Sequence, residues 1–119
     1  MEVNDQADFL NAACRFESDE TPTEILKKLQ KIEKTLKKSP PFRYGPRTID
    51  LDLLLVGEEV RTEDPILPHP KLHERRFVLE PLLELGGGEL MHPIFHRTLQ
   101  SYLPDVKGQE CRKTNIQLF

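Results

Sequence analysis

Apolar residues recur at helical spacing in the first third of the chain, with lysines between them: Ile25, Leu26, Leu29, Ile32 and Leu36. This period predicts an amphipathic helix whose lysine face is solvated. Thr21, Pro22 and Glu24 mark its start, because threonine caps, proline suits the first turn and the glutamate completes a capping box. The Ser39-Pro40-Pro41 stretch ends it.

Two segments flanking this helix read as strands. FLNAACRFE, residues 9–17, is interpreted as a strand. IDLDLLLV, residues 49–56, is an apolar run that contains two aspartates, and it is interpreted as a buried strand. Gly57 is expected to turn the second strand toward a short partner near Val60.

The second half of the chain is patterned as loop, helix and tail. Residues 64–70 are proline-rich and predict an ordered loop, and a further helix is expected around 94–103, after Pro93. The tail from Asp105 is polar and is expected to be loose. The apolar period of residues 72–85 predicts a helix bent or broken at Pro81, on the pattern Leu72, Phe77, Leu79, Leu82, Leu83 and Leu85.

Composition bounds the class of protein. The chain has 119 residues, with 37% hydrophobic and 31% charged residues, which is the size and balance of one globular domain. We expect residues 1–104 to form that domain and residues 105–119 to form a polar tail. The net charge of −3 argues against a general nucleic-acid or anionic-membrane surface, and no apolar run of membrane-spanning length exists. Cys14 and Cys111 lie far apart, which favours a reducing cytoplasmic setting, with one disulfide as the alternative.

The aspartates of the second predicted strand carry the candidate chemistry. Asp50 and Asp52 are two residues apart, so in a strand both carboxylates project from one face, where like charges are unfavourable without a cation. Magnesium is typically bound by one or two carboxylates together with substrate phosphates. A solvent-facing strand edge explains the pair equally simply. Arg47 lies just upstream, where its guanidinium could grip a phosphate or pair with an aspartate.

Two other patterns are not taken as sites. His69 and His73, like His92 and His96, are four residues apart, but neither pair has the glutamate of a zinc-binding HExxH helix, and prolines interrupt both segments. Three successive glycines at 86–88 lack the Gly-Lys-Ser/Thr of a phosphate loop, and they indicate a helix end.

Longer stretches carry a specific resemblance. GPRTIDLDLLL at 45–55 resembles the signature of the hydroxymethyl-dihydropterin pyrophosphokinase family, and the similarity extends to LPHPKLHERRFVLEPLLEL at 67–85, DFLNAA at 8–13 and QKIE at 30–33. The resemblance implies transfer of pyrophosphate from ATP to the hydroxymethyl group of 6-hydroxymethyl-7,8-dihydropterin, giving AMP, in folate biosynthesis. It also implies two magnesium ions and ATP as co-substrate.

The resemblance assigns a role to each matching residue. As the catalytic group it implies Asp50, Asp52 and Arg47, with the two aspartates as the magnesium ligands. As ATP contacts it implies Gln30, Glu33, Arg43, Arg47, His69 and Arg75. As pterin contacts it implies Phe9, Asn11, Tyr44 and Phe77, because a flat heterocycle stacks on aromatic rings and an amide can bond its edge. Without it, Gln30 and Glu33 would read as a solvated helix face, and Phe9 and Phe77 as core residues.

The resemblance also implies an α+β fold, a ferredoxin-like sandwich with helices packed on a small mixed sheet. Members of the family have a longer segment before the stretch that matches DFLNAA, and it supplies a first strand and part of the pterin pocket. We therefore expect an N-terminally truncated version that lacks the first βαβ portion. Either the strands at 9–17 and 49–56 pair directly, or self-association fills the gap. Lys37 or Lys38 stands where the family has an arginine.

Three hypotheses follow. The first is a pyrophosphokinase that acts on ATP and a reduced pterin. The second is a shortened relative that binds magnesium–nucleotide, or a partner protein, with weak or no catalysis. The third is an unrelated metal–nucleotide enzyme such as a glycosyltransferase, which leaves LPHPKLHERRF without an explanation.

We predict that the 119-residue chain by itself has little or no pyrophosphoryl transfer activity, because the pterin-side segment of the family has no match in it. The measurement is AMP formation from ATP that depends on the pterin substrate. A rate of about one per second or faster, an ordinary enzyme rate, contradicts the prediction.

Overall fold

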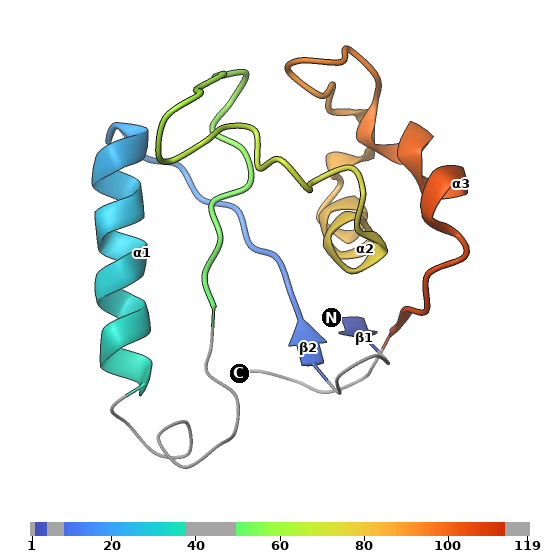
Figure 1. Ribbon diagram of the computed structural model, residues 1–119, viewed down its shortest axis with the longest axis horizontal. Coiled ribbons are helices and arrows are strands. Elements are labelled where there is room, and N and C mark those ends of the chain that lie inside the picture. Colours follow the sequence, from blue (N-terminus) through green and yellow to red (C-terminus); the bar gives the residue numbers. More distant parts are fainter. Residues whose placement is uncertain (1, 5–8, 38–49, 114–119) are drawn as a thin grey trace. The chain divides into compact units, whose positions relative to one another are not determined.

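The computed structural model describes residues 2–4, 9–37 and 50–113 (Figure 1). They group into two compact units, a first unit of residues 1–17 and 70–119 and a second unit of residues 18–69. Within the described residues, no helix has the length and apolar character needed to cross a membrane. The elements are β1 (Glu2–Asn4), β2 (Phe9–Asn11), α1 (Pro22–Lys37), α2 (Arg76–Glu84), the 3-10 helices η2 (Gly87–Glu89) and η3 (Leu99–Tyr102), α3 (Leu103–Val106) and β3 (Arg112–Lys113).

Helix α1 of the second unit begins where the sequence predicts. The Thr21 hydroxyl accepts a hydrogen bond from the backbone N–H of Glu24 at 3.2 Å and donates one to the Glu24 carboxylate at 3.1 Å. This satisfies one of the free amides that every helix start exposes. Ile25 is buried, whereas Ile32 is 47% exposed, so the apolar stripe is covered mainly at the N-terminal end of α1.

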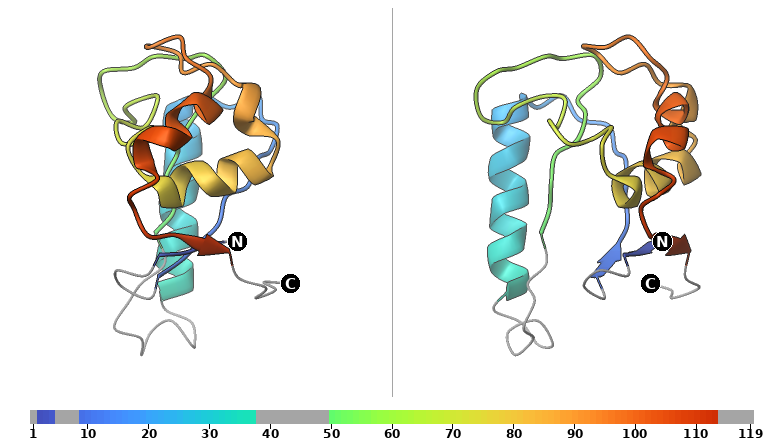
Figure 2. Two further views of the ribbon diagram at one scale, coloured as in Figure 1. Left: turned by 90° about the vertical axis from the view of Figure 1, so that its right-hand side faces the viewer. Right: turned by 45° about the vertical axis from the view of Figure 1, so that its right-hand side comes forward.

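The strand predicted at 49–56 does not form in the described residues. Residues 50–56 form no strand; residue 49 lies outside the described part of the chain. Figure 2 shows this segment running beside α1. The predicted turn at Gly57 does occur, with φ of +53° and a hydrogen bond from Glu59 N–H to Val56 O at 3.0 Å. The chain after it pairs within the loop, through two hydrogen bonds between Arg61 and Leu67, so no ladder forms along 50–56.

The first unit holds a three-stranded sheet in the order β2-β1-β3, with β1 antiparallel to both neighbours. The prediction of a strand over 9–17 is confirmed only for residues 9–11, since β2 ends at Asn11. Direct pairing of this strand with residues 49–56 does not occur in the described residues, because β2 pairs with β1. Helices and short strands confirm the α+β class; the described strands do not show the larger mixed sheet of a ferredoxin-like sandwich.

Helix α2 covers the later part of the predicted helix 72–85. It starts at Arg76 and continues through the buried Pro81 to Glu84, so of the predicted bend or break at Pro81 the break is absent and the bend stays a prediction. Gly86 follows with φ of +87°, the left-handed conformation that glycine supplies at helix ends, so the glycine run ends the helix as predicted.

The prediction of a helix around 94–103 is wrong for the first half of that range. Residues 91–98 form a loop closed by a bridge between Met91 and Thr98, and only Leu99 onward is helical. Inside the loop, Nδ1 of His92 accepts hydrogen bonds from the backbone N–H groups of Ile94 and Phe95, each at 3.2 Å. Side-chain capping of this kind competes with helix formation.

The core of the first unit brings the turn before α2, the loop 91–98 and the C-terminal helices together (Figure 2). The His92 ring is 1% exposed and lies 5.2 Å from the His73 ring and 4.6 Å from the Phe95 ring, centroid to centroid. The buried apolar side chains of this core are Leu72, Leu79, Leu99, Tyr102 and Val106. Since Val106 belongs to it and β3 follows, the prediction that the tail is loose from Asp105 is wrong up to Lys113.

We predict that His92 makes the protein less stable as the pH falls below 6.5. Burial, and after it the neighbouring His73 and His96, lower the pKa of His92 from its ordinary value of 6.5. The unfolded chain therefore binds the proton more readily than the folded one, so stability rises with pH through 6.5 and is lost below it. The limiting slope is about 1.4 kcal/mol per pH unit.

The measurement is the urea midpoint between pH 5 and 8, compared with His92→Asn, which keeps an acceptor near the two amides but does not titrate. His69→Asn, which removes a histidine of the second unit and leaves the His92 cluster intact, is the control. His73, which has Glu74 beside it, and Arg97, which lies over Tyr102, face the same cluster and remain in both variants. Parallel pH profiles for the wild type and His92→Asn contradict the prediction.

Candidate functional site

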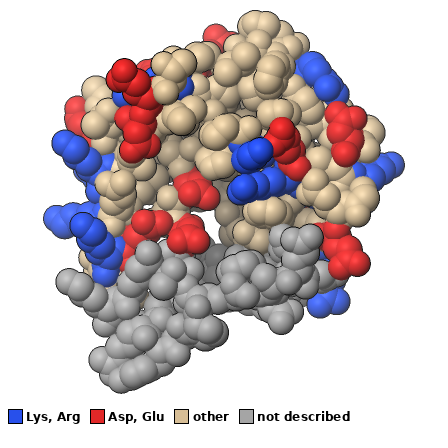
Figure 3. All heavy atoms as spheres, viewed as in Figure 1, with Lys and Arg blue, Asp and Glu red and all other residues tan. Residues whose placement is uncertain are grey.

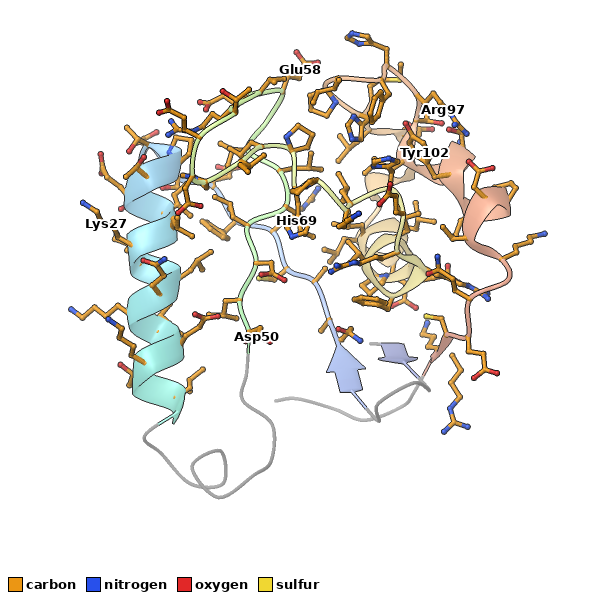
Figure 4. The ribbon with its side chains drawn as sticks, viewed as in Figure 1. Lys27, Asp50, Glu58, His69, Arg97 and Tyr102 are labelled. Carbon is orange, nitrogen blue, oxygen red and sulfur yellow. The ribbon has the colours of Figure 1, made fainter. Side chains whose placement is uncertain are left out.

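The two aspartates of the candidate site open toward solvent. Asp50 and Asp52 are exposed, whereas Leu51 between them is half-buried. Figure 4 shows Asp50 where the described segment begins beside α1. Both carboxylates are therefore open to solvent, although no strand ladder holds the segment. That they project from one face stays a prediction.

Glu33 holds this segment against α1. Its carboxylate accepts a hydrogen bond from the backbone N–H of Leu51 at 2.6 Å, in a partly buried position. A charged acceptor makes this bond stronger than one between neutral groups. The sequence suggested a nucleotide contact or a solvated helix face for Glu33; the structure gives it a different partner, the amide between the two aspartates.

The donor set around the aspartates fits one class of metal site. No group of three or more histidine, cysteine, aspartate and glutamate side chains that could hold a metal is found among the described residues. A zinc or calcium cage needs more protein ligands than two carboxylates. Two exposed carboxylates fit magnesium that takes its remaining ligands from water and phosphate oxygens.

Two predicted ATP contacts lie in the same unit. Gln30 is exposed one turn before Glu33 on α1. His69 is half-buried, and its backbone N–H donates to Leu54 O at 2.9 Å, which ties the end of the proline-rich loop to the aspartate segment. Figure 3 shows acidic side chains gathered beside α1, with basic ones along its outer edge. The exposed lysines of α1 are Lys27, Lys28, Lys31 and Lys34.

Three predicted site residues lie outside the described residues: Arg43, Tyr44 and Arg47. Their roles as phosphate and pterin contacts stay predictions.

The first unit carries the other predicted contacts. Arg75 immediately precedes α2, and its guanidinium carbon lies 5.7 Å from the centroid of the Phe77 ring. Asn11 ends β2, which packs against α2. Its Nδ2 is buried and has no hydrogen-bond partner among the described residues, which is unusual for a native polar group. The backbone of Phe9 lies in β2, whereas its side chain is outside the described part.

Sequence reasoning missed the residue that holds the backbone around Arg75. The side chain of Gln109 bonds to the main chain on both sides of it, at Glu74 O and at Arg76 N. No local pattern around position 109 signals this contact, because its partners lie more than thirty residues earlier.

Comparison with known proteins gives one family. The sequence model described as 7,8-dihydro-6-hydroxymethylpterin-pyrophosphokinase (HPPK) matches residues 1–87, which include every predicted site residue.

Curated relatives agree with this match. The 2-amino-4-hydroxy-6-hydroxymethyldihydropteridine pyrophosphokinase of Bacillus subtilis is 48% identical over 82 residues, 68% of this chain and 49% of that protein. The protein of the same name from Aquifex aeolicus is 39% identical over 101 residues, 84% of this chain and 62% of that protein. The folic acid synthesis protein fol1 of Pneumocystis carinii is 39% identical over 113 residues, 94% of this chain but 15% of that protein. The chain therefore spans about half the length of the two bacterial relatives and a small part of the fungal one.

We predict that Glu33→Ala loosens the backbone at Leu51, because it removes the carboxylate that accepts the Leu51 N–H. Hydrogen exchange of the Leu51 amide, followed by NMR, is expected to speed up about tenfold to hundredfold, since a hydrogen bond to a charged group contributes about 1.5–3 kcal/mol. Glu33→Gln keeps an acceptor and is expected to show an intermediate rate.

Glu63→Ala, which removes an exposed carboxylate from the same unit, serves as the control and is expected to leave the Leu51 rate unchanged. Equal exchange in Glu33→Ala and the wild type rules out the hydrogen bond as the restraint.

Proposed function

The chain belongs to the 7,8-dihydro-6-hydroxymethylpterin-pyrophosphokinase family, and from this premise we propose that it transfers pyrophosphate from ATP to the hydroxymethyl group of 6-hydroxymethyl-7,8-dihydropterin. The product serves folate biosynthesis, and AMP is released. The single observation that carries the proposal is the pair of exposed carboxylates of Asp50 and Asp52, held at Leu51 by Glu33, inside the matched region.

The proposed reaction is a substitution at phosphorus. The pterin hydroxymethyl oxygen forms a bond to the β-phosphorus of ATP, the bond from that phosphorus to the oxygen bridging the α-phosphate breaks, and AMP leaves with that oxygen. The hydroxyl proton passes to solvent or to a nearby base. Catalysis of such a transfer rests on positioning and on stabilising phosphate charge.

Asp50 and Asp52 are the residues proposed to hold two magnesium ions. Bound magnesium offsets the negative charge of the phosphates and of the leaving oxygen. The exposure of both carboxylates supports this, because magnesium keeps water and substrate oxygens among its ligands. Arg47 is proposed to steady the transferring phosphates, as a guanidinium does through paired hydrogen bonds.

The ATP contacts that the resemblance implies are part of the proposal: Gln30, Glu33, Arg43, Arg47, His69 and Arg75. Glu33 acts here by fixing the Leu51 amide.

The pterin pocket is proposed at Phe9, Asn11, Tyr44 and Phe77. The buried, unpartnered Nδ2 of Asn11 supports it, because that amide is a donor suited to a carbonyl or ring nitrogen of the heterocycle. The Phe77 ring, next to the Arg75 guanidinium, offers a face for stacking.

The family also implies a ferredoxin-like fold, and we extend the proposal to it. Self-association that completes the sheet remains part of the proposal. A cytoplasmic setting is proposed as well, and the exposed free thiol of Cys14 suits a reducing compartment.

The test measures AMP formation over hours with the pterin present and absent, together with MgATP affinity by calorimetry. We predict that Asp50→Asn and Asp52→Asn each weaken MgATP binding about tenfold or more and abolish pterin-dependent AMP, because each removes a charged oxygen ligand. Glu58→Gln, which neutralises an exposed carboxylate at the Gly57 turn, is the matched control (Figure 4).

The outcomes separate the hypotheses. Pterin-dependent AMP formation that is lost in both aspartate variants supports the enzyme, even at a low rate. Magnesium-dependent ATP binding without AMP favours the shortened, non-catalytic relative. Aspartate variants that bind MgATP as tightly as the wild type remove the proposed metal site.

A further inference from the structure

The C-terminal segment of the first unit reaches back to the backbone around Arg75. Oε1 of Gln109 accepts a hydrogen bond from the Arg76 N–H at 2.8 Å, and Nε2 of Gln109 donates one to Glu74 O at 2.8 Å. One side chain thus bonds to the residue before Arg75 and to the residue after it. Rotation of the Arg75 peptide units would break one or both bonds.

The Arg76 side chain also bonds to the segment that carries Gln109. Its guanidinium donates from one terminal nitrogen to Gln109 O at 3.0 Å and to Lys107 O at 3.4 Å, while its Nε donates to the Glu80 carboxylate at 3.2 Å. The Gln109 N–H donates to Val106 O at 3.0 Å, and Val106 is buried. The segment that presents Gln109 is therefore anchored in the core of the first unit. We call these contacts of Gln109 and Arg76 the Gln109 clasp.

The clasp takes the place of a missing helix cap. Arg75 is the residue that precedes α2, and its side chain makes no capping hydrogen bond. The first amides of a helix need outside acceptors, and Gln109 supplies one to Arg76. The Arg75 side chain is left free of the capping role, and its guanidinium lies over the Phe77 ring at 5.7 Å.

We propose that Gln109 is a positioning residue for nucleotide binding: its clasp sets the Arg75 backbone so that the guanidinium is presented to the phosphates of ATP. The inference rests on the proposed function of Arg75. It goes beyond the family match, because Gln109 lies outside residues 1–87. A pre-set backbone lowers the ordering cost of binding, since fewer torsions are restricted when the ligand arrives.

The experiment is a double-mutant cycle read by calorimetry with MgATP as the probe and no pterin, so that no turnover occurs. Arg75→Ala is expected to weaken MgATP binding about tenfold, the value of one charge-assisted contact. Gln109→Ala is expected to weaken it about threefold to fivefold. Adding Gln109→Ala to Arg75→Ala is expected to cause no further loss, because the clasp acts only through Arg75.

Controls separate positioning from general stability. Gln100→Ala truncates an exposed glutamine of the same unit and is expected to leave MgATP affinity unchanged. Gln109→Glu keeps an acceptor for the Arg76 N–H but loses the donor to Glu74 O, and is expected to fall between wild type and Gln109→Ala. Exchange of the Arg76 amide, measured by NMR without nucleotide, reports directly on the clasp and is expected to speed up in Gln109→Ala.

The readouts distinguish two failures. If Arg75→Ala weakens binding and Gln109→Ala does not, or if the two losses multiply in the double variant, the positioning role is overturned while the proposed function stands. If Arg75→Ala itself leaves MgATP affinity unchanged, the proposed nucleotide contact fails first and removes the positioning role with it.

Discussion

The hydrogen bond from the Leu51 amide to the Glu33 carboxylate is the contact on which the candidate metal site depends. Residues 50–56 carry no strand ladder, and the described backbone bond from the His69 N–H to Leu54 O ties this segment to the proline-rich loop, not to α1. In an extended chain the side chains of residues 50 and 52 lie opposite that of residue 51. By holding the Leu51 amide, Glu33 restrains the backbone that carries both aspartates.

The local signals in the sequence were sufficient for some elements and not for others. The start of α1 was predictable because Thr21 and Glu24 bond to each other within one turn. The strand expected at 49–56 was not, since a ladder depends on a partner elsewhere in the chain, and alternation alone describes only which side chains face solvent. The first half of the helix expected around 94–103 does not form, because the His92 imidazole accepts hydrogen bonds from two backbone amides of that stretch.

Some residues of the candidate site could likewise be predicted from the sequence, and others could not. Asp50 and Asp52 could be singled out from the sequence as neighbouring carboxylates, and both are exposed in the structure, whereas their shared face stays a prediction. The role of Glu33 could not, since its partner lies 18 residues away and is a backbone group that any residue could supply. Gln109 was hidden for the same reason: a polar residue in a polar tail carries no sign of the two main-chain groups it binds. Resemblance to a family identifies the groups that touch substrate more readily than those that hold them in place.

The pairing of β1 with β3 has a practical consequence. Glu2 and Lys113 are cross-strand partners, so the first and last described strands lie next to each other in one sheet. Because β1 lies between β2 and β3, one of its edges is paired by a strand that follows more than a hundred residues later. An unpaired edge strand exposes free backbone N–H and C=O groups, so a change that displaces Arg112 and Lys113 would open that edge of β1.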